Sequence, residues 1–102
     1  MKDQSITQLI NQLVEIKQKI DPEKKFERNF NRIFSILEDE GFTFQYPLGE
    51  KYNETRTDCE ASIVGEASEK MVITQVIKPM IYKKYNNEIT LIQKAVVIVE
   101  KI

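Results

Sequence analysis

Histidine and tryptophan are absent from this chain, and Cys59 is its single cysteine. Without histidine, the commonest general base and the imidazole ligand of zinc sites are missing. One cysteine can form no disulfide within the chain and cannot build a structural zinc site. We therefore expect a protein that is not an enzyme, with no metal site and no cofactor, in which Cys59 is a small buried strand residue.

Glycine and excess basic charge are also scarce. The three glycines belong to no phosphate-binding motif. The chain contains 15 Lys and Arg residues and 16 Asp and Glu residues, which gives a net charge of -1. Nucleic-acid binding normally needs a basic surface, so we expect no nucleic-acid partner. The cluster Tyr82, Lys83, Lys84 and Tyr85 is expected to be the flank of a hairpin, in which the lysines keep the strand edge soluble. A single-strand nucleic-acid module stays open as a weaker alternative.

The chain has no long apolar segment. Its longest apolar run covers residues 95–99, far too short to cross a bilayer. The sequence begins Met1-Lys2-Asp3-Gln4, which lacks the apolar stretch of a signal peptide. Together with the single cysteine, these features predict a soluble, cytoplasmic protein with no membrane partner.

The N-terminal part of the chain contains two patterns that are typical of amphipathic helices. Apolar residues from Ile6 to Ile20 recur in steps of three and four, which predicts an amphipathic helix. Asp21 and Pro22 then provide an N-cap and a first helical residue for a second helix. Gly41 is suited to end that helix as a left-handed cap. Helices joined by so short a break are expected to fold back as an antiparallel hairpin over residues 1–41.

A two-helix element cannot enclose its own core. The hairpin is therefore predicted to form a bundle by homodimerisation, with both apolar faces at the interface. The residues expected there are Ile6, Leu9, Leu13, Phe26, Phe30, Ile33 and Leu37.

After Gly41 the period of the pattern changes from about 3.6 to 2. The alternation predicts a small, mainly antiparallel β-domain over residues 42–102, and hence an α+β fold. The expected strands cover residues 42–46, 59–64, 71–77 and 89–99, with a loop at 48–58 and turns at 65–70 and Asn86-Asn87.

This order of parts resembles the GrpE family of nucleotide exchange factors. The similarity is carried by several short segments in sequence order, none of them specific alone. They are Gly41-Phe42-Thr43-Phe44, Pro47-Leu48-Gly49, Glu60-Ala61, Val76-Ile77-Lys78-Pro79 and the final strand Leu91-Ile92-Gln93-Lys94-Ala95-Val96-Val97-Ile98-Val99. Cys59 stands where the family has a histidine, and Gln93 where it has an arginine. The family's long N-terminal stalk helix has no counterpart here.

The resemblance implies a co-chaperone with a role in protein folding and the stress response. Members of the family dimerise through their short helices and use the β-domain to open the nucleotide-binding domain of a DnaK-type chaperone, which releases ADP. Carried onto this chain, the partner-binding residues are Glu60, Ala61, Gln93, Lys94, Val97 and Val99. The alternative is a homo-oligomeric adaptor for protein interactions, without exchange activity.

Overall fold

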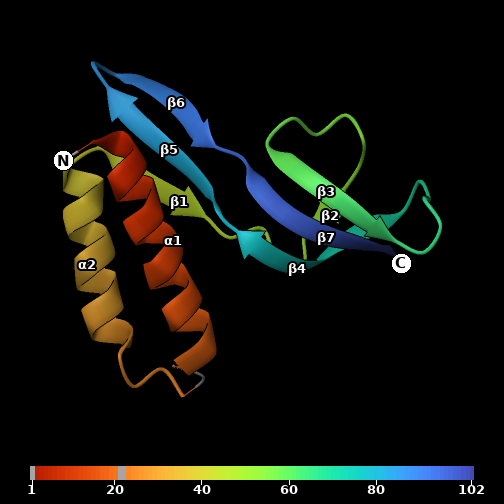
Figure 1. Cartoon of the computed structure of the whole chain (residues 1–102), viewed down its shortest axis with the longest axis horizontal. Coiled ribbons are helices and arrows are strands. Elements are labelled where there is room, and N and C mark those ends of the chain that lie inside the picture. Colours follow the sequence, from red (N-terminus) through yellow and green to blue (C-terminus); the bar gives the residue numbers. More distant parts are fainter. Residues whose placement is uncertain (1, 21–22) are drawn as a thin grey trace.

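The computed structural model describes residues 2–20 and 23–102, which form two helices followed by mainly antiparallel sheets (Figure 1). The predicted α+β class is confirmed at this level. The elements are α1 Asp3–Ile20, α2 Glu27–Asp39, β1 Phe42–Gln45, β2 Lys51–Tyr52, β3 Cys59–Val64, β4 Met71–Lys78, β5 Met80–Tyr85, β6 Glu88–Gln93 and β7 Ala95–Lys101.

The last four strands form one long antiparallel hairpin. β5 pairs with β6 near the tip, and β4 pairs with β7 nearer the base. Asn86 and Asn87 make the turn at the tip with φ angles of 49° and 67°, which is the backbone that a tight hairpin turn requires. The predicted turn at this dipeptide is confirmed. Pro79 and Lys94 interrupt the two arms, so the hairpin is divided into two sheets.

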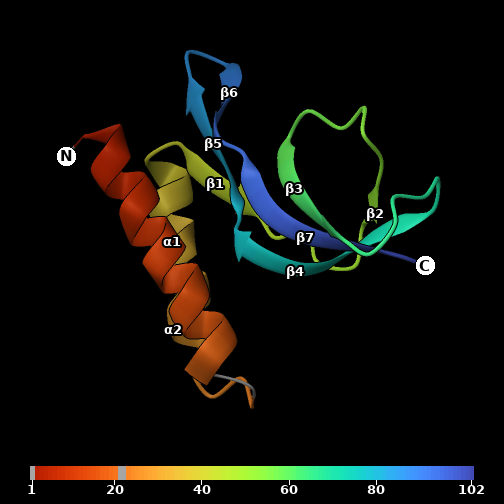
Figure 2. The ribbon, with the colours of Figure 1, turned by 45° about the vertical axis from the view of Figure 1, so that its right-hand side comes forward.

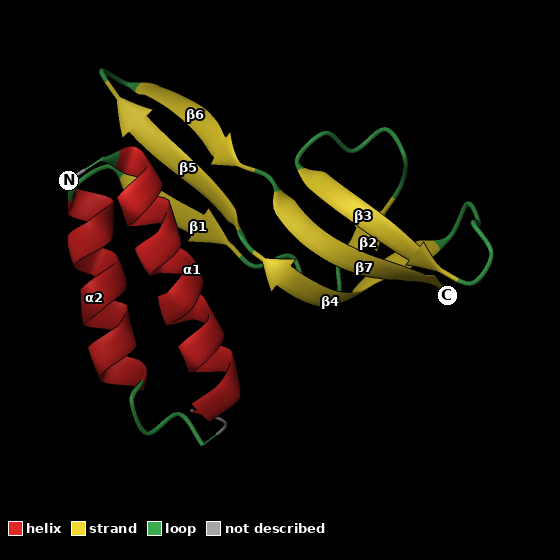
Figure 3. Cartoon of the chain, viewed as in Figure 1, coloured by secondary structure: helices red, strands yellow, loops and turns green. Residues whose placement is uncertain are grey.

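Each half of the hairpin recruits further strands (Figure 3). The half near the tip adds β1 and gives the three-stranded order β1-β5-β6. The other half adds β2 and β3 and gives the order β2-β4-β7-β3, in which β3 and β7 run parallel. Figure 2 shows this second sheet curling, with β2 and β3 rising from the same side of β4 and β7. Curling allows one face of the sheet to enclose a core of its own.

Two hydrophobic cores meet at β5. Met80 belongs to the core of the four-stranded sheet, while its neighbour Ile81 belongs to the core beneath the helices, and both are 0% exposed. Ile10 and Val14 of α1 fill the second core together with Ile81. The helices therefore bury apolar residues against the sheet β1-β5-β6. The expected boundary at residue 41 falls at a turn, but a shared core continues across it.

Several strand predictions need correction. β2 lies inside the expected loop 48–58, and β5 begins directly after Pro79, beyond the end of the expected strand 71–77. The expected strand 89–99 is two strands, because Lys94 separates β6 from β7. β5 is absent from the expected strand ranges, but its outer half, Tyr82-Lys83-Lys84-Tyr85, lies where the sequence predicts a hairpin flank.

The start of the second helix also differs from the prediction. α2 begins at Glu27, and its N-terminal cap residue is Phe26, which offers no side-chain hydrogen bond. Lys24 has a φ of 58°, a backbone conformation that no helix can contain. The predicted cap at Asp21 and Pro22 lies outside the described residues.

Gly41 ends the second helix as predicted. Its φ is +94°, and its N–H donates to the Glu38 carbonyl at 2.9 Å. The Gly41 carbonyl also accepts a 2.7 Å hydrogen bond from the N–H of Lys84, where β1 begins beside β5. A Cβ atom at Gly41 would lie 2.8 Å from the Lys84 carbonyl oxygen. Two separate constraints, backbone conformation and close approach, thus require glycine.

Replacing Gly41 and Gly49 by alanine separates these constraints. Gly49 has a similar φ of +83°, but no atom lies within 4 Å of the position of its Cβ. Gly49→Ala should lower the free energy of unfolding by about 1–2 kcal/mol, the cost of a left-handed L-residue. Gly41→Ala should lower it further, because the Lys84 backbone must also move. Urea unfolding of both variants measures the difference, and equal losses would contradict the close-approach argument.

Candidate partner surface on the final strand

The final strand has a closed face and an open face. Ala95, Val97 and Val99 are 0% exposed and belong to the core of the four-stranded sheet. Val96 and Ile98 alternate with them and are only half-buried. The side chains of Val97 and Val99 therefore cannot contact a partner, and their assignment to the partner surface is wrong. Side chains alternate between the two faces of the strand, so a partner can instead reach Val96 and Ile98 of β7.

Strand β3 extends the open face of β7. The two strands run parallel with Glu60 beside Val96 and Ser62 beside Ile98. Glu60 and Ser62 are exposed, whereas Ala61 is half-buried and packs against the core. We call Glu60, Ser62, Val96 and Ile98 the open face. It presents two aliphatic side chains beside a carboxylate and a hydroxyl.

Lys94 is exposed directly before β7, next to the open face. No ion pair engages its ammonium group within the described residues. Lys94 and Glu60 are thus the two predicted partner residues whose charged groups remain accessible.

Gln93 has a structural role that the sequence did not reveal. Its Nε2 atom donates to Asn11 Oδ1 at 2.8 Å and to the Pro79 carbonyl at 2.9 Å, and its Oε1 accepts from Asn11 Nδ2 at 2.9 Å. We call this arrangement the amide clamp. It joins α1 to both arms of the hairpin at the point where Pro79 and Lys94 divide them. Asn11 could have been noticed as a polar residue next to the buried stripe of Ile10 and Val14.

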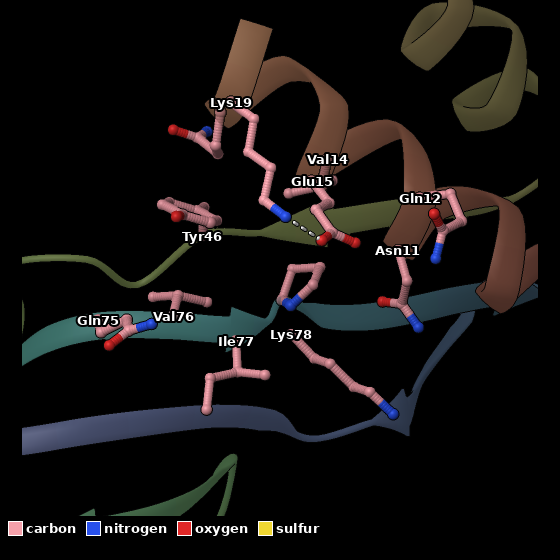
Figure 4. A pocket seen from close by; sticks show the side chains of 12 residues that line it. Asn11, Gln12, Val14, Glu15, Lys19, Tyr46, Gln75, Val76, Ile77 and Lys78 are labelled. Atoms are coloured by element: carbon pink, nitrogen blue, oxygen red, sulfur yellow. Dashed lines mark hydrogen bonds and ion pairs between the residues drawn. The ribbon is translucent and has the colours of Figure 1, made fainter.

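A groove of about 380 Å³ lies beside the amide clamp, between α1 and β4 (Figure 4). Figure 4 shows Lys19 reaching along α1 to Glu15, with which it forms a 2.7 Å ion pair. Val76 and Ile77 line the side of the groove formed by β4. Its ionic groups on α1, Glu15 and Lys19, neutralise each other, and neither histidine nor cysteine is among the residues that line it.

The loop before β3 is fixed by Arg56. Its guanidinium donates to Asp58 Oδ1 at 2.7 Å, to the Lys51 carbonyl at 3.0 Å and to Glu50 Oε1 at 2.9 Å. Hydrogen bonding to Arg56 lowers the pKa of Asp58 below its ordinary value. The Asp58 carbonyl in turn accepts from the N–H of Ala95 at 3.0 Å. These bonds place the first residues of β3 beside β7 and so assemble the open face.

Cys59 is 7% exposed in β3, which confirms its prediction as a small buried strand residue. Burial raises the pKa of its thiol to about 11. A thiol is a nucleophile only when ionised, so this cysteine is unreactive near neutral pH. Among the described residues, no group of three or more His, Cys, Asp or Glu side chains could hold a metal ion.

The aromatic and basic cluster of β5 does not form one surface. Tyr82 packs against the core of the four-stranded sheet, and burial raises the pKa of its hydroxyl. Lys83 forms a 2.8 Å ion pair with Asp3 and lies 5.3 Å from the centre of the Phe42 ring. The nucleic-acid alternative needs exposed aromatic and cationic groups on one face, and this pairing weakens it.

The residues expected at a dimer interface differ widely in exposure. Leu9 is 47% exposed and Phe26 is 48% exposed. Phe30 is 6% exposed and is therefore a core residue, so its assignment to the interface is wrong. The half-buried members of the predicted set are Ile6, Leu13, Ile33 and Leu37. Ile16 and Ile36, at 41% and 57% exposure, are open helical residues that the predicted set omitted.

Comparison of the chain with protein-family models, with curated proteins and with solved structures finds no match in any of the three. Within the described residues, no helix has the length and apolarity that crossing a membrane requires.

Charge substitutions at Gln93 and Lys94 should differ in the size of their effect on stability. Gln93→Glu removes the two hydrogen bonds that Gln93 donates in the amide clamp. It also places a carboxylate against the Pro79 carbonyl, so unfolding should become easier by about 1–3 kcal/mol. Lys94→Glu alters an exposed side chain and should change stability by less than about 0.5 kcal/mol. Thermal unfolding of the two variants gives the comparison. A stable Gln93→Glu protein would show that the clamp is dispensable.

Proposed function

We propose that this chain is a GrpE-like cytoplasmic co-chaperone, a non-catalytic nucleotide exchange factor that promotes ADP release from a DnaK-type chaperone ATPase. The observation that carries the proposal is the pairing of β3 with β7. Glu60-Ala61 and the final strand resemble the family at positions 30 or more residues apart, and the fold brings them into register on one sheet. The open face and Lys94 are the partner surface that we assign to it.

Exchange by a non-catalytic factor requires differential binding. The factor must bind the open, nucleotide-free ATPase more tightly than the closed ADP form, because equal affinity for both shifts no equilibrium. A surface that holds one conformer open must itself resist deformation. The amide clamp supplies this resistance, since it fixes the hairpin to α1 at the bend between the two sheets.

The open face combines apolar area with charge. Val96 and Ile98 offer partly exposed aliphatic area, and Glu60 and Lys94 lie at its margin. Apolar contact would supply affinity, and the two charges would select orientation and speed association. Neither role needs a titrating or nucleophilic side chain.

Exchange activity can be measured with a DnaK-type ATPase loaded with fluorescent ADP. Adding the chain should accelerate nucleotide release, and Lys94→Glu or Glu60→Lys should slow association with the ATPase by roughly tenfold. Lys101→Glu is the matched control, because it makes the same charge change at an exposed position farther along β7.

If the unmodified chain leaves ADP release unchanged, the exchange proposal fails and the adaptor alternative takes its place. If the chain accelerates release and Lys94→Glu and Glu60→Lys act like the control, the function stands but the open face is the wrong surface.

We further propose that the two helices act as a hairpin that dimerises. They run in opposite directions in Figure 1, and the Lys17 ammonium of α1 lies 5.7 Å from the centre of the Phe34 ring of α2. Because the sheet β1-β5-β6 covers Ile10 and Val14, only the helical surface that faces away from it is open to a second copy. Leu9 and Ile16 lie seven residues apart on that surface.

Sedimentation should therefore show a dimer at micromolar concentration. Leu9→Glu combined with Ile16→Glu should weaken it, because burying these two side chains contributes about 1–2 kcal/mol each. Ile89→Glu is a suitable control, since Ile89 is 69% exposed on the hairpin and distant from the helices in sequence. A chain that stays monomeric at high micromolar concentration would rule out the dimer.

A further inference from the structure

The outward surface of α2 carries charges sorted by sign. Arg28, Arg32, Ile36 and Asp39 follow one another in steps of four, four and three, which places them on one face of the helix. All four are exposed, and Ile36 is 57% exposed. Both arginines lie in the first half of the helix, and the acidic side chains Glu38, Asp39 and Glu40 lie at its end. We call this face the charge-sorted face.

This arrangement opposes the helix dipole at both ends. A helix favours anions near its N-terminus and cations near its C-terminus. α2 has Arg28 in its first turn beside the single acid Glu27, and its last turn contains no basic residue. The sorting therefore costs the isolated helix stability, and it does not arise from ion pairs along α2.

The charges of this face also have no ionic partner elsewhere in the described part of the chain. Within residues 2–20 and 23–102, Arg28, Arg32, Asp39 and Glu40 form no ion pair. The sheet beneath the helices meets the opposite side of α2, which carries Phe34 and Leu37. Within the described residues, the charges of the charge-sorted face thus have no ion-pair partner, and its apolar residue Ile36 stays exposed.

We propose that the charge-sorted face binds the same face of a second copy, with the two α2 helices antiparallel. When the contact is centred between Phe34 and Ser35, Ile33 of one copy meets Ile36 of the other. In the same register, Arg28 comes level with Gly41 and Arg32 with Leu37 of the second copy. Glu40 and Asp39 then lie one and two residues farther along the axis, about 1.5 and 3 Å, which is within the reach of the two long arginine side chains. The reverse pairing follows by two-fold symmetry. Charge complementarity identifies the partner as a second copy of this chain. The basic end of the charge-sorted face attracts the acidic end of the same face on another molecule.

The alternative parallel arrangement fails on the same charges. A two-fold axis along the helices would place Arg28 and Arg32 against their own counterparts, and the acidic ends against each other. Like charges in contact oppose association. The helix dipoles are likewise paired favourably only in the antiparallel arrangement.

The contact is small, which determines its strength. A helix of 13 residues is about 20 Å long, so α2 packed on its copy buries less area than the standard interface of about 1,600 Å². We expect micromolar association with a strong dependence on salt, because the attraction between solvent-exposed charges weakens as the salt concentration rises. This inference rests on the proposed dimerisation and names the surface and direction of the contact.

Sedimentation of four forms of the full chain tests the arrangement. Arg28→Glu with Arg32→Glu should weaken the dimer by on the order of tenfold. Adding Asp39→Lys and Glu40→Lys to that variant exchanges the two ends and should restore the dimer, which a parallel contact could not do. Lys78→Glu with Lys101→Glu is the matched control: it changes the net charge equally on exposed lysines of the sheet and should leave the dimer constant close to that of the unmodified chain.

Rising salt should weaken the dimer of the unmodified chain and of the four-fold variant. A dimer that strengthens with salt, or that is indifferent to the arginine substitutions, would overturn the antiparallel α2 contact while leaving a dimer through Leu9 and Ile16 in place. A chain that is monomeric at all concentrations would rule out both the α2 contact and the dimer through Leu9 and Ile16. The exchange function is tested separately, by the measurement of ADP release.

Discussion

The amide clamp is the constraint on which the shape of this protein depends. A long hairpin interrupted at Pro79 and Lys94 would be free to bend at that point, because ladder hydrogen bonds are missing there. Gln93 fixes the bend by donating to the backbone of one arm while its own backbone belongs to the other. The second donor and the acceptor of the same amide hold Asn11 on α1. Three segments of the chain thus meet at one side chain, whose amide nitrogen donates two hydrogen bonds and whose amide oxygen accepts one.

Periodicity made much of the fold predictable. The helical stripes, the change of period after Gly41 and the Asn86-Asn87 turn all follow from local sequence rules, and the structure agrees with each of them. Local rules predicted only a hairpin flank at residues 82–85, and they did not predict that β5 begins at Met80, directly after Pro79. They also placed the start of α2 too early, since nothing in the sequence announces the left-handed Lys24.

The candidate surface was only partly predictable, for a reason of geometry. Alternation along a strand tells which residues share a face, but not which face meets the core. Family resemblance selected Val97 and Val99 together with Lys94, and the curl of the sheet decided that the valines face inward. Gln93 could not be assigned from sequence at all, because its partners lie 14 and 82 residues away along the chain.

The neighbouring positions of Met80 and Ile81 bear on how the chain can be dissected. β5 supplies one fully buried side chain to each of the two cores. If one core unfolds, β5 is disturbed, and the other core loses support as well. A fragment cut at Gly41 would leave Phe42 and Ile81 facing water without the helical cover. We therefore expect the helices and the sheets to unfold together, and we expect residues 42–102 not to fold as an autonomous module.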